Sequence, residues 1–139
     1  MAAKDIFHEV VKKALQKDGW QITHDPLSLS VGGVNISIDL GAERLIAAER
    51  EGKKIAVEVK SFLERAFAIS EFHTALGQFI NYRGALRPEE PDRVLYLAVP
   101  LSTHQSFFQL DFPKAMVEEN QVKMIIYDAK REVIAEWKN

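Results

Sequence analysis

The chain has 139 residues, of which 47% are apolar, and its 18 Lys and Arg residues against 20 Asp and Glu residues give a formal net charge of -2. This size and apolar content predict a single globular domain over residues 1–139, while the near-neutral charge argues against a protein that coats nucleic acid. The absence of cysteine excludes disulfides and thiolate chemistry. No apolar run reaches the length of a membrane span and the N-terminus lacks a secretory-signal pattern, so we expect a cytoplasmic protein.

Residues 2–17 are predicted to form an amphipathic helix. Apolar side chains recur in it at helical spacing, and Gly19 is a stop signal. Glu9 flanks the apolar face. It is interpreted either as a solvated residue of an amphipathic helix or as an acid that belongs to a functional site.

Three strand-like segments follow this helix. Residues 34–40 alternate between aliphatic and polar side chains, including Asp39, after a tight turn at residues 31–34. Residues 43–50 and 54–61 flank the dipeptide Glu51-Gly52, which is a hairpin signal. With a two-residue turn, Leu45 lies opposite Glu58 and Glu43 lies opposite Lys60, whereas a three-residue loop would shift this register.

The sequence Glu58-Val59-Lys60 places an acid and an amine where the strand pattern favours buried aliphatic residues. Residues two apart on a strand project from the same face at a spacing of roughly 6.6 Å, so the two charges lie side by side. A carboxylate is a hard oxygen ligand of the kind that Mg²⁺ prefers, and a Lys can stabilise or activate a nucleophile. The pattern therefore favours metal-dependent phosphodiester hydrolysis, with an ordinary alternating edge strand as the alternative.

Residues 70–86 are predicted to form a second helix, with its core face at Phe72, Ala75, Leu76, Phe79 and Ile80. Gln78 and Tyr82 stand one turn apart, and Tyr82 is alternatively a packing residue. Further on, the pattern predicts a central strand over residues 93–99, a helix beginning at residues 102–105, a short helix over 113–120, and strands over 122–127 and 132–137. The coarse order α-β-β-β-α-β-α-β-β predicts an α/β (α+β) domain, a mixed sheet flanked by helices.

Local cations and aromatics are the remaining candidates for contacts with partners. Several cations are interpreted either as contacts for DNA or as solvated surface charges. They are Lys12, Lys13, Lys17, Lys53, Lys54, Arg65, Arg83 and Arg87. Phe107, Phe108, Phe112 and Trp137 are either core residues or a partner surface. The histidines are dispersed, and His8 and Glu9, being adjacent on a helix, are not expected to share a face, so zinc hydrolase chemistry is not expected.

An acid that precedes a hairpin ending in Glu58-Val59-Lys60 resembles the core of the PD-(D/E)XK nuclease superfamily, although the Pro-Asp dipeptide of that core is absent at this position. Gln78 and Tyr82 on the next helix resemble the Gln-x-x-x-Tyr motif of the RecB-type branch. The resemblance implies a restriction-endonuclease-like fold in which Glu58, with Asp39 or Glu43, holds Mg²⁺ or Mn²⁺. It further implies that Lys60 stabilises the attacking hydroxide, that Gln78 orients it, and that Glu9 adds a ligand.

Segments 5–9, 18–27, 39–49 and 57–62, together with the end of the chain at 133–137, closely resemble the XisH family. This resemblance implies a controlling factor for excision of the fdxN element, which a site-specific recombinase removes during cyanobacterial heterocyst differentiation, with XisI as a companion factor. Two functional classes remain open: a metal-dependent DNA endonuclease, and a non-catalytic accessory module that binds DNA, the recombinase or XisI. We expect a homodimer, because so small a domain needs two sites or a partner to act on duplex DNA.

Overall fold

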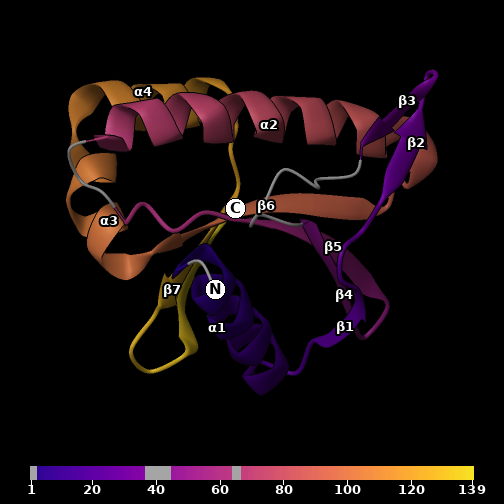
Figure 1. The fold of residues 1–139 in the computed structure, drawn as a ribbon, viewed down its shortest axis with the longest axis horizontal. Coiled ribbons are helices and arrows are strands. Elements are labelled where there is room, and N and C mark those ends of the chain that lie inside the picture. Colours follow the sequence, from indigo (N-terminus) through magenta and orange to yellow (C-terminus); the bar gives the residue numbers. More distant parts are fainter. Residues whose placement is uncertain (1–2, 37–44, 64–66) are drawn as a thin grey trace.

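The computed structural model of the protein describes residues 3–36, 45–63 and 67–139. A six-stranded sheet lies between helices, with strand order β1-β4-β5-β6-β7-β8, and a separate two-stranded hairpin, β2-β3, stands at one end of the molecule (Figure 1). The expected mixed sheet flanked by helices is therefore confirmed. None of the described helices is long and apolar enough to cross a membrane.

The elements in chain order are α1 (Ala3–Lys17), β1 (Gln21–His24), β2 (Leu29–Val31), β3 (Val34–Ile36), β4 (Leu45–Arg50), β5 (Lys53–Val59), α2 (Ala68–Glu89), β6 (Arg93–Pro100), α3 (Leu101–Gln105), the 3-10 helix η2 (Phe107–Gln109), α4 (Asp111–Glu119), β7 (Met124–Asp128) and β8 (Val133–Lys138). The three central strands β5, β6 and β7 are parallel, whereas β1, β4 and β8 pair antiparallel with their neighbours. Helices cover both faces of the parallel centre, which explains why β6 is apolar along most of its length.

Two hydrophobic cores lie on the two faces of this sheet. On one face, Val10, Val11 and Leu15 of α1 pack with Ile55, Val57 and Val59 of β5 and with apolar residues of the neighbouring strands. On the other face, Ala56 of β5 belongs to the core that contains the buried side of α2. Alternate residues of β5 therefore point to opposite helices, as the period of a strand requires, and the predicted orientation of its aliphatic residues is confirmed.

The β4–β5 hairpin has the predicted register. Glu51 and Gly52 form a two-residue turn with φ angles of 51° and 79°, which are the positive values of a type I′ turn. Leu45 is consequently paired with Glu58 and Arg50 with Lys53. The pairing predicted between Glu43 and Lys60 falls partly outside the described residues.

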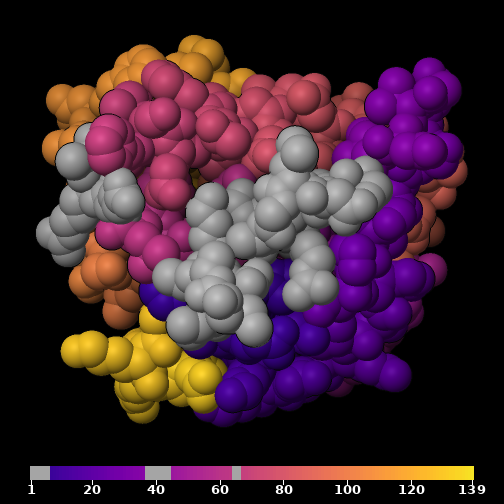
Figure 2. Space-filling view, in the orientation of Figure 1, coloured from indigo at the N-terminus to yellow at the C-terminus, as the bar shows by residue number. Residues whose placement is uncertain are grey.

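The structure differs from the predicted order near the N-terminus and after β6. The short strand β1, which is the edge strand next to β4, was not predicted, and β2 was missing from the order. The tight turn predicted at residues 31–34 is confirmed, because β2 pairs with β3 through Gly32 and Gly33. Figure 2 shows the β2–β3 hairpin on the surface beside α2. The strand predicted over residues 34–40 is observed at Val34–Ile36, and its later part lies outside the described residues. The helices predicted to begin at residues 102–105 and to span 113–120 are observed as α3 and α4, and the 3-10 helix η2 between them was not predicted. The coarse order had counted these helices as one element.

One predicted core residue also needs correction: Ile80 is 41% exposed. Among the aromatic residues left open between core and partner surface, Phe108 is buried with Phe107 packed against it, and Phe112 is 56% exposed. The buried side of α2 continues instead through Tyr82, Ala85 and Leu86. Ile80 follows the buried Phe79 directly, so it is rotated away from the sheet.

Candidate functional site

Glu58 and Lys60 lie at the carboxyl end of β5, at the centre of the sheet. Each is only 3% exposed, and Lys60 Nζ lies 3.7 Å from Glu58 Oε2. Both side chains belong to the α2 side of the sheet because they alternate with the aliphatic residues that face α1. The structure therefore brings together the acid and the amine that the sequence singled out.

Helix α2 adds Gln78 to this pair. Lys60 Nζ donates a hydrogen bond of 2.5 Å to Gln78 Oε1, which joins residues 18 positions apart. Tyr82 lies one turn further along the helix and is 5% exposed, so it faces the same buried side of α2. Gln78, Glu58 and Lys60 thus form one cluster, which we call the β5 charged cluster.

The backbone of Lys60 is held by two neighbouring strands. Its N–H donates to the carbonyl of Ala98 in β6 at 3.0 Å, and its carbonyl accepts a hydrogen bond of 3.0 Å from the buried hydroxyl of Tyr127 in β7. The first of these bonds extends the parallel pairing of β5 with β6 one residue beyond the end of the strand. The ammonium is therefore projected from a rigid part of the sheet, which is what a positioned functional group requires.

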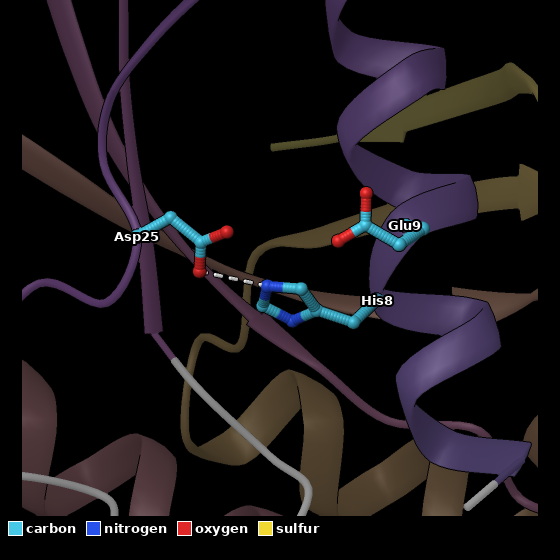
Figure 3. Close-up of side chains that lie close together, drawn as sticks. All are labelled: His8, Glu9 and Asp25. Atoms are coloured by element: carbon cyan, nitrogen blue, oxygen red, sulfur yellow. Dashed lines mark hydrogen bonds and ion pairs between the residues drawn. The ribbon is translucent and has the colours of Figure 1, made fainter. Parts of the chain in front are cut away.

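The remaining acids implied by the resemblance are placed differently. Asp39 and Glu43 lie outside the described residues. Glu9 is on α1, the helix that covers the other face of the sheet; its side chain is 55% exposed and lies 3.6 Å from Lys12 Nζ. Figure 3 shows Glu9 beside His8 on α1, with Asp25 opposite.

The structure shows a second polar cluster that the sequence did not reveal. His8, which is 1% exposed, shares a hydrogen bond of 2.8 Å between Nε2 and Asp25 Oδ1, and Lys12 Nζ lies 2.7 Å from Asp25 Oδ2. One ligand atom each from His8, Glu9 and Asp25 lie within 4.8 Å of one another (Figure 3). The expectation that His8 and Glu9 do not share a face is therefore corrected, because both side chains reach the same neighbourhood.

The electrostatics of this second cluster favour the charged forms of Asp25 and Lys12. Burial raises the pKa of Asp25, but hydrogen bonds from Lys12 and His8 outweigh it, so the pKa of this carboxyl lies below its usual value. The hydrogen bond to Asp25 raises the pKa of Lys12. An imidazole and two carboxylates suit a divalent transition metal, but the Lys12 ammonium contacts both carboxylates here, so a metal would have to replace it.

Both clusters lie toward the same end of the sheet. The N–H of Leu27, two residues after Asp25, donates to the carbonyl of Leu45 at 2.7 Å, and Leu45 is paired with Glu58. On the other side, Tyr127 bonds the Lys60 carbonyl and packs edge-on against Phe7, the neighbour of His8. The only signal for Asp25 in the sequence is a polar residue after a short strand, and its contact with His8 spans 17 positions, so no local pattern could have found it.

The predicted DNA-contacting cations have mixed surroundings. Lys12 and Lys13 are engaged by carboxylates, and Lys17 and Arg83 bond backbone carbonyls. Lys53, Lys54 and Arg87 are exposed, and Arg65 lies outside the described residues.

The fold and the β5 charged cluster define a small α/β protein in which a buried acid and amine lie at the carboxyl end of a central parallel strand, with a half-buried amide from α2 beside them. The family model described as XisH protein matches residues 1–135 of the chain. The chain belongs to the XisH family.

Two solved structures are similar to this chain over nearly all of its length. An XisH family protein from Nostoc punctiforme PCC 73102 is 72% identical, with a TM-score of 0.90 over 97% of this chain and 100% of that one. An fdxN element excision controlling factor protein from Anabaena variabilis is 71% identical, with a TM-score of 0.91 over 97% of this chain and 99% of that one. No curated protein matches the chain at a significant level.

Proposed function

We propose that this chain is an excision controlling factor that acts on DNA as a Mg²⁺- or Mn²⁺-dependent endonuclease with a PD-(D/E)XK, restriction-endonuclease-like fold. The observation that carries the proposal is the buried Lys60 ammonium, hydrogen-bonded to Gln78 and 3.7 Å from Glu58 at the end of a central strand. Burying two charges costs several kcal/mol per ion unless their partners compensate. Retaining such charges at a strand end is more typical of a functional site than of a core.

The residues present fit a hard divalent cation in part. Glu58 offers a buried carboxylate, which is the oxygen donor that Mg²⁺ and Mn²⁺ accept, and either Asp39 or Glu43 would complete the site. Glu9 is not assigned to this site, because it is exposed on the helix that covers the other face of the sheet. When bound, such a cation would lower the pKa of a coordinated water and offset charge on the phosphate. Lys60, held by Gln78, would place a fixed positive charge beside the attacking oxygen, and Gln78 would orient that oxygen.

A second candidate function is a non-catalytic accessory module that binds DNA, a site-specific recombinase or a XisI-like companion protein. The same geometry favours it in one respect: Lys60 already has two partners in Glu58 and Gln78, and its side chain is only 4% exposed. A saturated, enclosed ion pair is also what a structural element requires. In this case the β5 charged cluster stabilises the fold and the partner binds elsewhere.

The biological setting that we propose follows the family. The relative from Anabaena variabilis is described as an fdxN element excision controlling factor. We propose the same role for this chain in the cytoplasm of a cyanobacterium, during heterocyst differentiation. We also propose that it acts as a homodimer with a XisI-like companion, because two copies or a partner would present the contacts that duplex DNA requires.

The experiment that separates the two functions is a cleavage assay on supercoiled, linear and branched DNA in the presence of Mn²⁺. The enzyme proposal predicts cleavage by the wild type and its loss in Glu58→Gln and Lys60→Met. The matched control is Glu119→Gln, since Glu119 is an exposed acid on α4, away from the cluster.

Circular dichroism must show that each variant is folded, because the cluster is buried. Cleavage that persists in folded Glu58→Gln would contradict the assigned role of this carboxylate. DNA binding without cleavage by the wild type, with and without a XisI-like partner, would favour the accessory module.

A further inference from the structure

A cavity of about 450 Å³ lies at the opposite end of β5 from Glu58 and Lys60. Lys53 and Lys54 begin the strand and line this cavity, whereas Lys60 follows its other end. Six residue steps on a strand separate Lys54 from Lys60 by about 20 Å. The cavity also opens on the α1 side of the sheet, because Ile55, Tyr96 and Trp137 in its lining belong to that core or pack on it. It is therefore distinct from the β5 charged cluster.

Aromatic side chains form one side of this cavity. Trp137 lies between two other rings, with its centroid 5.7 Å from that of Trp20 and 5.1 Å from that of Tyr96. Trp20 and Tyr96 are buried and Trp137 is half-buried, so the indole of Trp137 gives the wall an exposed aromatic surface. Val94 in the same lining is 37% exposed. An apolar, partly aromatic wall of this kind favours a planar ligand.

Cationic residues line the cavity opposite the aromatic wall. They are Lys53, Lys54 and Arg50, and Asp92 is the acidic side chain in the lining. Lys53 shares the α1 side of the sheet with Ile55, whereas Lys54, the next residue, shares the opposite side with Ala56. Arg50 is paired with Asp18, at 3.4 Å between Nη1 and Oδ2, but Lys53 is exposed and has no ion-pair or hydrogen-bond partner within the described part of the chain. Lys53 is therefore the available cation on the side of the cavity, and an exposed cation of this kind attracts an anion.

The chain holds Arg50 in place between these two sides. Its guanidinium lies 4.9 Å from the centroid of the Trp20 ring, and its Nη1 donates to the carbonyl of Asp18 at 2.7 Å. Gly19 has a φ of 89°, and a Cβ added there would lie 3.3 Å from Arg50 Cδ, so the close approach needs glycine. Arg50 Nε and Trp20 Nε1 are buried and have no hydrogen-bond acceptor among the described residues. Unsatisfied donors next to a cavity favour a ligand that brings acceptor oxygens.

We infer that this cavity binds a nucleotide, with the base against Trp137 and the phosphate on Lys53. A base offers the planar face that the indole favours, and a phosphate offers the charge and the acceptor oxygens that the cations and unsatisfied donors favour. The ligand is either a free nucleotide or a nucleotide unit of a nucleic-acid strand. The inference does not depend on the proposed cleavage, because it uses none of the residues of the β5 charged cluster.

Calorimetric titration and intrinsic fluorescence test this inference on the full chain. Both tryptophans of the protein line the cavity, so a ligand bound there changes the whole tryptophan signal. The probes are thymidine monophosphate, a short single-stranded oligothymidylate with a terminal phosphate, inorganic phosphate and thymidine. We expect saturable binding of at least one of the first two, weaker binding of the last two, and weaker binding as the salt concentration rises.

The decisive variant is Lys53→Gln, with Lys54→Gln as a control that removes the same charge from the opposite side of the same strand. The first should weaken binding about fivefold or more and the second should change it less. Glu58→Gln should bind like the wild type. Binding of the mononucleotide identifies a free nucleotide, and binding of the oligonucleotide alone identifies a strand. No binding of either, equal binding of inorganic phosphate, or equal weakening in the two lysine variants would overturn the inference.

Discussion

Replacing Lys60 by Met removes a buried ammonium while keeping an unbranched side chain of similar length. The Glu58 carboxylate would then lie beside an apolar side chain. Gln78 Oε1 would lose the hydrogen bond of 2.5 Å that it accepts from Lys60 Nζ. Removing one partner of a buried ion pair costs about 3–5 kcal/mol of folding free energy. At about 3 °C per kcal/mol for a domain of this size, Tm should fall by roughly 10–15 °C.

The assay is equilibrium unfolding in urea, followed by circular dichroism, for Lys60→Met, Glu58→Gln and the double variant. The double variant should be more stable than the sum of the single losses predicts by about 1 kcal/mol or more, because neutralising Glu58 removes the carboxylate that the first change leaves uncompensated. Lys114→Met, at an exposed position of α4, should change stability by no more than about 0.5 kcal/mol. A loss of less than about 1 kcal/mol in Lys60→Met, or simple additivity, would refute the placement of these two charges.

Two further substitutions test the surroundings of the site. Asp25→Asn should cost about 1.5–3 kcal/mol at neutral pH, because it removes the charge that Lys12 and His8 contact. The folded pKa of Asp25 lies below its usual value of 3.8, so the stability that Asp25 contributes is present above that value and is lost as pH falls through the folded pKa. The Asp25→Asn variant should therefore lose less stability than the wild type between about pH 5 and pH 2. Equal acid sensitivity of the two proteins would contradict this. Gly52→Ala should cost about 1 kcal/mol because Gly52 has a φ of 79° in the β4–β5 turn, whereas Gly77→Ala, in open space within α2, should be neutral or stabilising in the same thermal unfolding assay.

The parts of the fold that the sequence predicts well are those with strong local signals. The Glu51-Gly52 turn is the clearest example: a two-residue type I′ hairpin sets the register of every pair in β4 and β5, so the position of Leu45 opposite Glu58 follows from counting. The helical period of α1 and α2 likewise predicts the elements that lie on the two faces of the sheet. Gln78 was found because it lies one turn from Tyr82 on a helix that follows the strand.

The parts that were missed depend on contacts between distant segments. β1 has four residues and no alternation strong enough to indicate a strand, and its place beside β4 comes from tertiary pairing. The contact of His8 with Asp25 joins a helix to a loop, and no spacing rule relates the two. Ile80 was expected in the core because it continues the helical spacing of the apolar residues before it, but the buried side of α2 continues through Tyr82 instead.

The central claim is that Glu58 helps to hold a divalent cation, and calorimetric titration of Mn²⁺ tests it most directly. The account predicts saturable Mn²⁺ binding by the wild type and by Glu119→Gln, and its loss in a Glu58→Gln variant that remains folded by circular dichroism. Asp25→Asn, measured alongside, separates this site from the His8, Glu9 and Asp25 group. No Mn²⁺ binding by the wild type, with or without DNA, or binding that is unchanged in folded Glu58→Gln, would contradict the account.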